Sequence, residues 1–380
     1  MTQQPQRTAI VHEWFTSMRG GEKCVEALCE LFPRATVFTL MHVKGSVSPT
    51  IEQMPIQTSF IQKLPFAANR YRYYLPLFPG AVQRFDLEKF DLVVSSNHCV
   101  AKGVRVPEHA LHVCYCHSPM RYIWDLYDDY FGKDRAGVLT RIGMRAALPY
   151  LRRWDLRTAS NPHYFIANSA NVQRRIKDIY NRSSDIIYPP VNTSLFQLSG
   201  RNDGYFLVVS AFVPYKRIDL AIRAFNSTGD RLVIVGDGPD AGRLQEMAGP
   251  TIDFVGWQPD ERLKDFYAGC RAVVFPGEED FGIVPVEAMA SGKPVIAYAK
   301  GGALETVVDT AGLKTGVLFR EQTVESLVEA IRRCKEAVFT PDILRSHALS
   351  FDREIYKQKM KEYIAKKWAA FSADSRKSAQ

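Results

Sequence analysis

The chain has 380 residues, of which 46% are hydrophobic and 24% are charged, and its formal net charge is +8. This length exceeds what one hydrophobic core usually serves, so we expect two folded domains and exclude a disordered chain. The basic balance favours an anionic partner, such as a phosphorylated ligand, a nucleic acid or an acidic membrane surface, without selecting among them. No apolar run reaches the ~18 residues that span a bilayer. The first residues also lack the pattern of a signal peptide, so we expect a cytoplasmic protein.

Short apolar runs and helical patterns alternate along the first half of the chain. The apolar runs, which are typical of buried strands, lie at 8–14, 91–96, 110–116 and 163–169. The helical patterns between them lie at 21–32 and 171–180. Continuous apolar strands separated by helices indicate a parallel sheet that is covered on both faces. We expect Cys114 and Cys116 on one face of a strand, and all seven cysteines reduced and buried, because none shows a metal-binding spacing.

The second half repeats this pattern. Its strand-like runs lie at 204–210, 230–236, 251–256, 270–276 and 293–298. Two such series predict two doubly wound α/β domains. The stretch 188–204 is rich in Pro, Gly, Ser and Asn, so we place the boundary there and expect domains at 1–195 and 196–352. We also expect a last helix at 353–371 that packs back on the first domain, and a disordered tail at 372–380.

A cluster of acids lies where a predicted strand meets a helix, in the segment FPGEEDFGIVPVEAMASGKPVIA at 275–297. Ligands of doubly wound sheets bind in such loops, at the carboxyl ends of the strands. The first backbone N–H groups of the helix have no partner inside it and would form an anion site. Those groups belong to Gly282, Ile283 and Val284.

Two carboxylates of this segment are candidates for the recognition of hydroxyl groups. Glu279 lies in the loop, and Glu287 lies one turn into the helix. Both would accept hydrogen bonds from ribose or sugar hydroxyls. The alternative is that the acids at 278–280 are solvated turn residues, which the helix dipole favours near a helix start.

Glu279 and Glu287 are separated by seven residues, and the string EDFGIVPVEAMASGKPVIA resembles the E-x7-E region of retaining glycosyltransferases of family 4. Segments similar to other family motifs lie at 208–225, 233–239, 254–276 and 300–307, and at 19–23 and 115–125. The resemblance thus covers nearly the whole chain. It implies the α/β GT-B fold, with two Rossmann-like doubly wound domains that face a central cleft and a C-terminal helix that crosses back to the N-terminal domain. The N-terminal domain would bind the acceptor and the C-terminal domain the nucleotide sugar.

The resemblance also implies roles for individual residues. Those implied as catalytic are His117, Glu279, Lys216 and Arg217. The donor would be bound by Gly20, Gly21, Lys216, Arg217, Gln258, Asp260, Glu279, Phe281, Gly282, Ile283, Val284 and Glu287. The acceptor side would carry Arg121, Trp124 and Asp125.

Lys216 and Arg217 follow a predicted strand, where their cationic heads would stabilise the donor diphosphate as its charge grows in the transition state. Many relatives carry an arginine five positions before the lysine, where this chain has Ala211. Arg217 stands where a glycine is often found, and we hypothesise that it takes over that charge. The alternative is that both bases are solvated at a helix start.

Residues of the first domain are less specific. Gly20 and Gly21 would let the backbone approach a phosphate or a sugar closely, or they simply form a tight turn. His117 ends a predicted strand, and the resemblance places it beside the transferred sugar, whereas a lone histidine is often structural. We interpret His98 and His112 as structural.

The implied reaction is transfer of a hexose from a nucleotide diphosphate sugar, with retention at the anomeric carbon. The segments 116–127 and 214–222 look most like bacterial mannosyltransferases of O-antigen or exopolysaccharide synthesis. That likeness implies GDP-mannose as donor and a lipid-linked oligosaccharide or polysaccharide as acceptor. We expect no cofactor and no metal, because Lys216, Arg217 and helix N–H groups would replace the cation. The alternatives are a UDP-sugar donor, a GT-B nucleotide-sugar epimerase or phosphorylase, and a non-catalytic nucleotide-sugar binding subunit.

The segment 59–85 carries Lys and Arg but no acid, interleaved with aromatic residues, and a second basic stretch lies at 145–157. This composition is typical of interfacial membrane contact and would suit an acceptor anchored as a polyprenyl diphosphate. We therefore expect a protein that is peripheral on the inner face of the plasma membrane. One alternative is a helix whose aromatic residues are core. The other is single-stranded nucleic-acid binding by stacking, but no nucleic-acid module is visible, so we expect no such partner.

Overall fold

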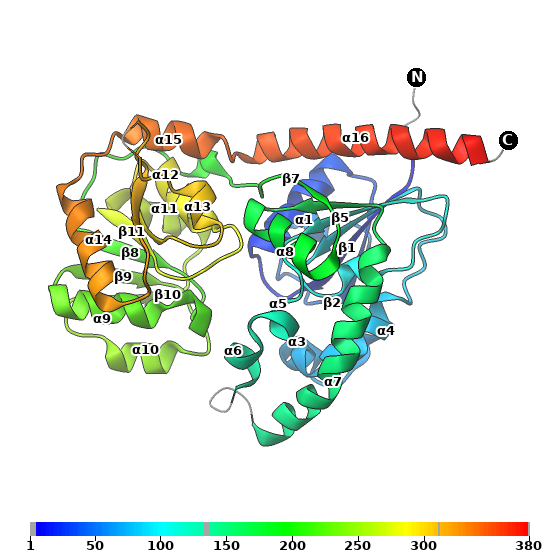
Figure 1. Cartoon of the computed structure of the whole chain (residues 1–380), viewed down its shortest axis with the longest axis horizontal. Coiled ribbons are helices and arrows are strands. Elements are labelled where there is room, and N and C mark those ends of the chain that lie inside the picture. Colours follow the sequence, from blue (N-terminus) through cyan, green and yellow to red (C-terminus); the bar gives the residue numbers. More distant parts are fainter. Residues whose placement is uncertain (1–4, 133–136, 311, 379–380) are drawn as a thin grey trace. The chain divides into compact units, whose positions relative to one another are not determined.

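The computed structural model describes residues 5–132, 137–310 and 312–378 (Figure 1). The chain divides into two compact units, unit 1 (Met1–Pro190 and Tyr356–Gln380) and unit 2 (Val191–Ile355). Each unit is built on an open parallel sheet covered by helices. The chain passes from unit 1 to unit 2 at Val191, inside the Pro- and Gly-rich stretch 188–204.

Unit 1 contains a seven-stranded sheet in the order β3-β2-β1-β4-β5-β6-β7. The strands that the apolar runs predicted are β1 (Thr8–Phe15), β4 (Leu92–Asn97), β5 (Leu111–Cys116) and β6 (Tyr164–Ala167). The others are β2 (Thr36–His42), β3 (Ile56–Thr58) and β7 (Ser184–Ile186). The sequence pattern missed β3 and β7 because three residues are too few to show a period. In the centre of the sheet, Ile10 pairs with Val37 and Val94, which explains why Ala9, Ile10 and Val11 are all apolar and fully buried.

Hydrophobic cores cover both faces of this sheet. Ala9 and Val11 point into one core, whereas Ile10 points into the other. Helices α1 (Gly20–Leu31) and α16 (Arg353–Ser378) pack on the Ile10 side, and α7 (Val138–Arg157) packs on the opposite side. The remaining α-helices are α2 (Pro49–Glu52), α3 (Ala67–Arg70), α4 (Phe78–Val82), α5 (Arg121–Trp124), α6 (Tyr127–Phe131) and α8 (Ala170–Tyr180).

The segment 59–85 folds into short helices rather than one amphipathic helix. Between and around α3 and α4 it forms 3₁₀ helices at Phe60–Lys63 and Tyr71–Leu77, and three prolines interrupt it. Tyr71 and Phe78 are buried in the core, whereas Phe66 and Tyr73 are 74% and 67% exposed. The segment therefore supplies residues to both the core and the surface. A single helix whose aromatic residues are all core does not describe it.

Unit 2 contains a six-stranded sheet in the order β10-β9-β8-β11-β12-β13. Its predicted strands are β8 (Tyr205–Val209), β9 (Arg231–Val235), β10 (Ile252–Gly256), β11 (Ala272–Phe275) and β12 (Val295–Tyr298). The edge strand β13 (Gly316–Phe319) was not predicted. The α-helices are α9 (Ile218–Thr228), α10 (Ala241–Met247), α11 (Asp260–Gly269), α12 (Ile283–Ala290), α13 (Ala303–Thr306), α14 (Val324–Glu336) and α15 (Pro341–Leu349).

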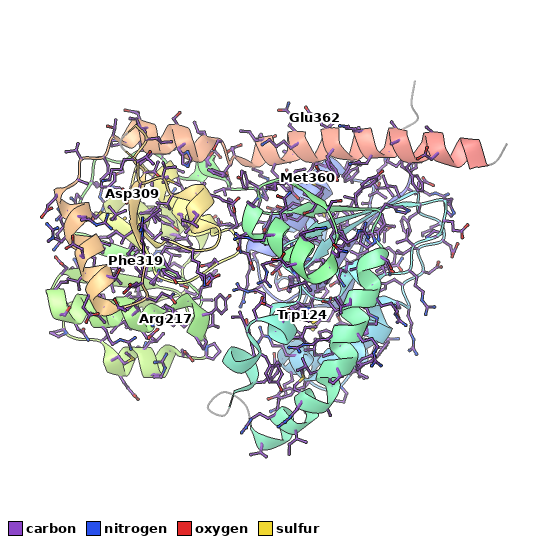
Figure 2. The ribbon with its side chains drawn as sticks, in the orientation of Figure 1. Trp124, Arg217, Asp309, Phe319, Met360 and Glu362 are labelled. Carbon is purple, nitrogen blue, oxygen red and sulfur yellow. The ribbon has the colours of Figure 1, made fainter. Side chains whose placement is uncertain are left out.

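Helix α16 returns the chain to unit 1, where Tyr356, Met360 and Ile364 enter the core. Figure 2 shows Met360 on the side of α16 that faces the sheet and Glu362 on the opposite side. The helix continues to Ser378, so residues 372–378, expected to be disordered, are helical instead. These residues include neither Pro nor Gly, and nothing in them stops a helix. Residues 379–380 of the expected tail lie outside the described residues.

The seven cysteines are all free and buried, as predicted. Cys114 and Cys116 share one hydrophobic core with Phe165 and Val172, which confirms that they lie on the same face of β5. Among the described helices, none combines the length and the apolar character needed to cross a bilayer.

Candidate functional site

Three loops meet at the carboxyl ends of strands in unit 2. They follow β8, β11 and β12, and glycines allow their close approach. A Cβ on Gly277 would lie 2.7 Å from Lys216 Cα, and a Cβ on Gly302 would collide with Phe281. The Gly302 N–H also donates to the Glu279 carbonyl at 2.8 Å. The loop that carries the predicted acids is therefore fixed between its two neighbours.

Lys216 and Glu279 form an ion pair across two of these loops. Lys216 ends the short helical turn that follows β8, and Glu279 lies in the loop between β11 and α12. Both side chains are largely buried, with exposed fractions of 15% and 20%. The structure thus brings together two residues that were predicted separately, one for the diphosphate and one for sugar hydroxyls.

Arg217 adopts a left-handed backbone conformation with φ of 53°. This conformation is rare outside glycine and explains why the resemblance places a glycine at this position. The guanidinium of Arg217 lies 3.3 Å from Asp219 Oδ1 and donates to Gln322 Oε1 at 3.2 Å. Gln322 in turn donates to the carbonyl of Pro276, at the end of β11. Arg217 is therefore tied to the same loop as Glu279, and its role toward a diphosphate stays a prediction.

Helix α12 begins at Ile283, directly after Gly282, whose φ is 85°. Glu287 lies one turn into this helix and is only 4% exposed. Tyr267, on α11, donates its hydroxyl to Glu287 Oε2 at 2.8 Å. Burial and the charge of Glu287 raise the pKa of Tyr267 well above its usual range, so the phenol stays a donor. The predicted Phe281 packs its ring against Phe351 in the interior, which is a structural contact.

Gln258 and Asp260, predicted to bind the donor, lie where β10 leads into α11. Gln258 donates its amide to the carbonyl of Val255 at 2.8 Å, and Asp260 is the first residue of α11. The strand order places β10 two positions from β8 and three from β11. These two residues therefore lie on a different part of the sheet edge from Lys216 and Glu279.

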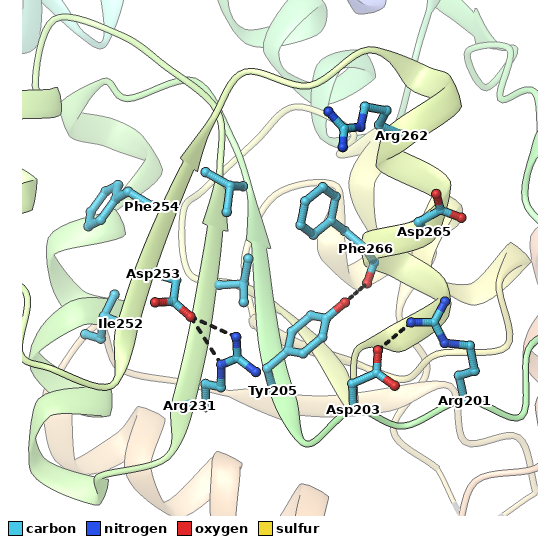
Figure 3. Close-up of a pocket in the computed structure, with 12 residues that line it drawn as sticks. Arg201, Asp203, Tyr205, Arg231, Ile252, Asp253, Phe254, Arg262, Asp265 and Phe266 are labelled. Atoms are coloured by element: carbon cyan, nitrogen blue, oxygen red, sulfur yellow. Dashed lines mark hydrogen bonds and ion pairs between the residues drawn. The ribbon is translucent and has the colours of Figure 1, made fainter.

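Unit 2 also has a pocket of about 650 Å³, which is not lined by Lys216 or Glu279 (Figure 3). It is lined mainly by the first residues of β8, β9 and β10 and by α11. Arg201 pairs with Asp203 at 2.6 Å, and Arg231 pairs with Asp253 at 3.0 Å. Ligands of doubly wound sheets bind at the opposite, carboxyl ends of the strands, so we do not regard this pocket as the functional site.

In unit 1, His117 follows β5 and lies beside the first turn of α1. Its Nε2 is 2.8 Å from Ser96 Oγ, and a Cβ on Gly21 would lie 3.8 Å from the same nitrogen. Gly20 and Gly21 are the first two residues of α1 rather than a separate loop. Burial, together with the charges of His98 and His12, lowers the pKa of His117 to about 3, so its ring is neutral.

Glu13 and His98 form a second feature of this strand edge, which the sequence interpretation missed. Glu13 is fully buried on β1, and its Oε1 accepts backbone N–H groups from His98, Cys99 and Ala101 at 3.0, 2.8 and 3.2 Å. Its Oε2 lies 3.1 Å from His98 Nδ1. Burial would raise the pKa of Glu13, but His98 and these hydrogen bonds outweigh it and lower that pKa. The signal in the sequence was a Glu and a His at the ends of two adjacent predicted strands.

The predicted acceptor-side residues are engaged in contacts within unit 1. Trp124 donates its indole N–H to Asp155 Oδ2 at 2.8 Å, and Asp125 pairs with Arg175. Asp155 also holds the buried ammonium of Lys102 at 2.8 Å. Arg121, the first residue of α5, accepts the N–H of Asp125 at its carbonyl. These contacts give Trp124 and Asp125 a structural role, and a role toward an acceptor stays a prediction.

The fold is shared with solved structures over nearly the whole chain. Sucrose-phosphate synthase from Thermosynechococcus elongatus matches with a TM-score of 0.73 and 19% identity, over 96% of this chain and 100% of that chain. HepE from Anabaena, solved in complex with UDP, matches with a TM-score of 0.69 and 18% identity, over 95% and 100%. At such identities the likeness shows the fold alone. Together with the two parallel, Rossmann-like sheets, it makes the chain a GT-B protein.

Two family models match the chain. The model described as Glycosyltransferase Family 4 matches residues 18–195, and the model described as Glycosyl transferases group 1 matches residues 195–338. The two matches together run from residue 18 to residue 338. The chain belongs to the family 4-type GT-B glycosyltransferases.

Curated relatives align over shorter segments. The O-antigen chain mannosyltransferase RfbU of Salmonella typhimurium is 33% identical over 140 residues, which cover 34% of this chain and 40% of that protein. The GDP-mannose-dependent alpha-mannosyltransferase of Mycobacterium tuberculosis is 40% identical over 111 residues, or 29% of this chain and 28% of that protein. The chain thus spans less than half the length of these relatives.

Proposed function

We propose that this protein is a retaining hexosyltransferase that uses a nucleotide diphosphate sugar. The observation that carries the proposal is the Lys216–Glu279 ion pair at the start of α12, in the interlocked loops of unit 2. An ammonium and unpaired helix N–H groups suit a diphosphate, and a neighbouring carboxylate suits the hydroxyls of the attached sugar. The family assignment supports the same reaction class.

In the proposed step, the bond between the anomeric carbon and the leaving phosphate oxygen breaks on the face where the acceptor attacks. The acceptor hydroxyl oxygen forms the new bond to that carbon, and its proton passes to the departing phosphate oxygen. The products are the nucleoside diphosphate and the glycosylated acceptor. Lys216, Arg217 and the first N–H groups of α12 would stabilise the charge on the leaving group, so the proposal includes no metal or other cofactor.

We propose mannose, carried by GDP, as the transferred sugar. Support comes from the two relatives described above, whose names specify mannosyl transfer, and one of which names GDP-mannose. A UDP-sugar is the alternative donor.

We propose a lipid-linked saccharide acceptor and contact with an anionic membrane. The support is a basic and apolar patch in unit 1 that we call the 59–85 patch. Its members are the exposed residues Lys63, Phe66, Arg70, Arg72, Tyr73 and Leu77. Helix α7, which packs beside Tyr71–Leu77, adds the exposed Val138 and Ile142. Exposed apolar side chains among cations are what an anionic bilayer surface binds.

Thermal-shift titration with GDP, UDP and ADP, with and without their sugars, tests the proposal. We expect selective stabilisation by GDP and GDP-mannose, because a ligand that binds only the folded state raises its stability. Stabilisation by UDP alone would move the donor to the alternative. No response to any nucleotide would remove the proposed function. The anomeric configuration of the product, read by NMR, then separates retention from inversion and transfer from epimerisation.

A further inference from the structure

One glutamine holds the guanidinium of Arg217 in place. Gln322 lies between β13 and α14, and its Oε1 accepts a hydrogen bond from Arg217 Nη1 at 3.2 Å. Its Nε2 donates to the carbonyl of Pro276, directly after β11, at 2.9 Å. Only this orientation of the amide satisfies both partners, because a guanidinium can only donate and a carbonyl can only accept. The amide of Gln322 is therefore fixed, and it fixes the guanidinium in turn.

Arg217 and Gln322 meet because the two helices that follow them pack together. Arg217 directly precedes α9, and Gln322 lies two positions before α14. The two helices contact each other and contribute to one hydrophobic core. Both residues thus lie beyond the carboxyl ends of strands, Arg217 after β8 and Gln322 after β13. This is the edge of the sheet where the proposed function requires the diphosphate.

The guanidinium of Arg217 is anchored at two of its nitrogens. The Nε–H donates to Asp219 Oδ1 at 3.3 Å, and one Nη1–H donates to Gln322. Within the described ranges, no residue bonds Nη2 or the second hydrogen of Nη1, and Nη2 is not a buried atom. Since a guanidinium has five N–H groups, about three remain for a ligand. They belong to an oriented cation whose side chain is 30% exposed.

The surrounding charges leave this guanidinium cationic. Asp219 is shared between two arginines, because Arg223 Nη2 also donates to its Oδ2 at 2.5 Å. Two positive charges therefore face one negative charge. Gln322 adds a hydrogen bond to Arg217 without adding a second carboxylate. The guanidinium is thus held firmly but is not neutralised.

A purely structural glutamine, which only ties the loops together, is the competing interpretation. The bond from Gln322 to Pro276 would be enough for that role. A carboxylate at position 322 would hold Arg217 more strongly than an amide, since a hydrogen bond between two charged groups is the stronger kind. The neutral amide therefore indicates that the guanidinium is oriented for a further, anionic partner.

We propose that Gln322 is a positioning residue for the donor diphosphate, because it orients the guanidinium of Arg217 without neutralising it. The neighbouring Lys216 is paired with Glu279, whereas Arg217 only shares a carboxylate. Arg217 is thus the less neutralised of the two cations. The inference rests on the proposed function, since it needs a nucleoside diphosphate as the ligand, and it adds a residue that no sequence motif indicated.

Binding of GDP to the full-length protein, measured by isothermal titration calorimetry, tests the charge. Gln322→Glu keeps the length of the side chain and an acceptor for Arg217, but it adds the negative charge that the proposal excludes. We expect GDP affinity to fall about tenfold or more, because the hydrogen bonds between guanidinium and phosphate weaken. Gln358→Glu is the matched control. Gln358 is exposed on α16 and donates to Glu362, so the same change of charge there should leave GDP affinity unchanged.

Gln322→Met tests the positioning. It removes both hydrogen bonds at nearly the same volume, and we expect GDP affinity to fall about three- to tenfold. In the Arg217→Ala background the same substitution should have no further effect, because the guanidinium is no longer there to be oriented. A glutamine that only ties the loops together would cause the same loss in both backgrounds. Should Gln322→Met fail to fold, Gln322→Glu still decides the question.

Two results would overturn the proposal. One is a GDP affinity in Gln322→Glu that equals or exceeds that of the wild type, and the other is a loss in Gln322→Met that persists in the Arg217→Ala background. If UDP rather than GDP stabilises the wild-type protein, UDP replaces it in both titrations. Failure of the proposed function would appear separately, as a wild-type protein that binds no nucleoside diphosphate.

Discussion

Tyr267 donates its hydroxyl to Glu287 Oε2 at 2.8 Å, and both residues are buried. Glu287 was expected to receive hydroxyls of a ribose. One of its oxygens instead accepts a hydrogen bond from α11, which fixes the orientation of the carboxylate on α12. A ligand would therefore meet a carboxylate whose position is set before binding, which reduces the entropy lost on binding.

Tyr267→Phe should lower the free energy of unfolding by about 1–3 kcal/mol, because it leaves a buried carboxylate oxygen without its donor. The same variant should weaken nucleotide-sugar binding. Tyr363→Phe is the matched control, since Tyr363 makes the same kind of bond to Asp185 at 2.9 Å but on the exposed surface. Urea denaturation measures the free energy of unfolding of both variants. Equal losses of stability in the two would show that burial of the carboxylate is not decisive.

Lys216→Ala should lower kcat by about a hundredfold or more, because a preorganised cation at the leaving group is lost. Lys300→Ala is the control, since Lys300 pairs with Glu278 in the neighbouring loops at 3.1 Å but is 58% exposed. That variant should retain most of the activity. Steady-state kinetics with GDP-mannose compare them. If both lysines gave the same loss, the charge of the loops as a whole, rather than Lys216, would be responsible.

Arg217→Gly and Arg217→Ala separate the effect of the backbone conformation on stability from the effect of the charge on activity. Both variants lose the guanidinium, but only alanine keeps a Cβ at φ of 53°. We therefore expect Arg217→Ala to be about 1 kcal/mol less stable than Arg217→Gly, and both to lose activity equally. Ala211→Arg in either background should restore only part of the turnover. Near-normal turnover in Arg217→Ala would contradict the proposal that this arginine replaces the one absent at 211.

Acid should destabilise the protein through its buried neutral histidines. Burial, with the charge of His163, lowers the pKa of His112 to about 3, and Ser95 holds its Nε2 at 2.9 Å. A histidine in the unfolded chain has a pKa of ~6.5. The unfolded state therefore binds more protons between about pH 6.5 and pH 3, and stability falls as pH falls through that range.

His112→Gln should flatten this slope, whereas the exposed His109→Gln should not change it. The free energy of unfolding at several pH values provides the measurement. His98 acts in the opposite direction: its raised pKa adds stability that is present at low pH and lost as pH rises through the folded pKa. A steeper slope in His112→Gln than in the wild type would contradict the assignment of a neutral buried imidazole.

The sequence was informative wherever a signal is local. The strands β8 and β11 are continuous apolar runs, and β1, β4 and β5 each contain a shorter one. The start of α12 at Ile283 follows from Gly282 and the acids before it. The edge strands β3, β7 and β13 are three or four residues long, so pairing with a neighbour, rather than their own pattern, makes them strands.

In the candidate site too, local motifs predicted single residues but not the contacts between them. Lys216 and Glu279 were each predicted from their own motifs, but their ion pair depends on loops that are 63 positions apart in the sequence and meet through Gly277. Glu13 and His98 are 85 positions apart, and only the pairing of β1 with β4 brings them together. Burial could not be predicted from the sequence either, since Phe281 and Phe66 are both phenylalanines but only Phe281 lies in the interior.

The exposed aromatic residues of the 59–85 patch are expected to contribute to membrane binding. The double variant Phe66→Ser, Tyr73→Ser should reduce binding to phosphatidylglycerol vesicles severalfold, because each removes apolar area that enters the interface. Val338→Ser is the control, since Val338 is 90% exposed but lies in unit 2, outside the 59–85 patch. Co-sedimentation measures binding, and vesicles of pure phosphatidylcholine should bind every variant weakly. Unchanged binding in the double variant would contradict membrane contact by the 59–85 patch.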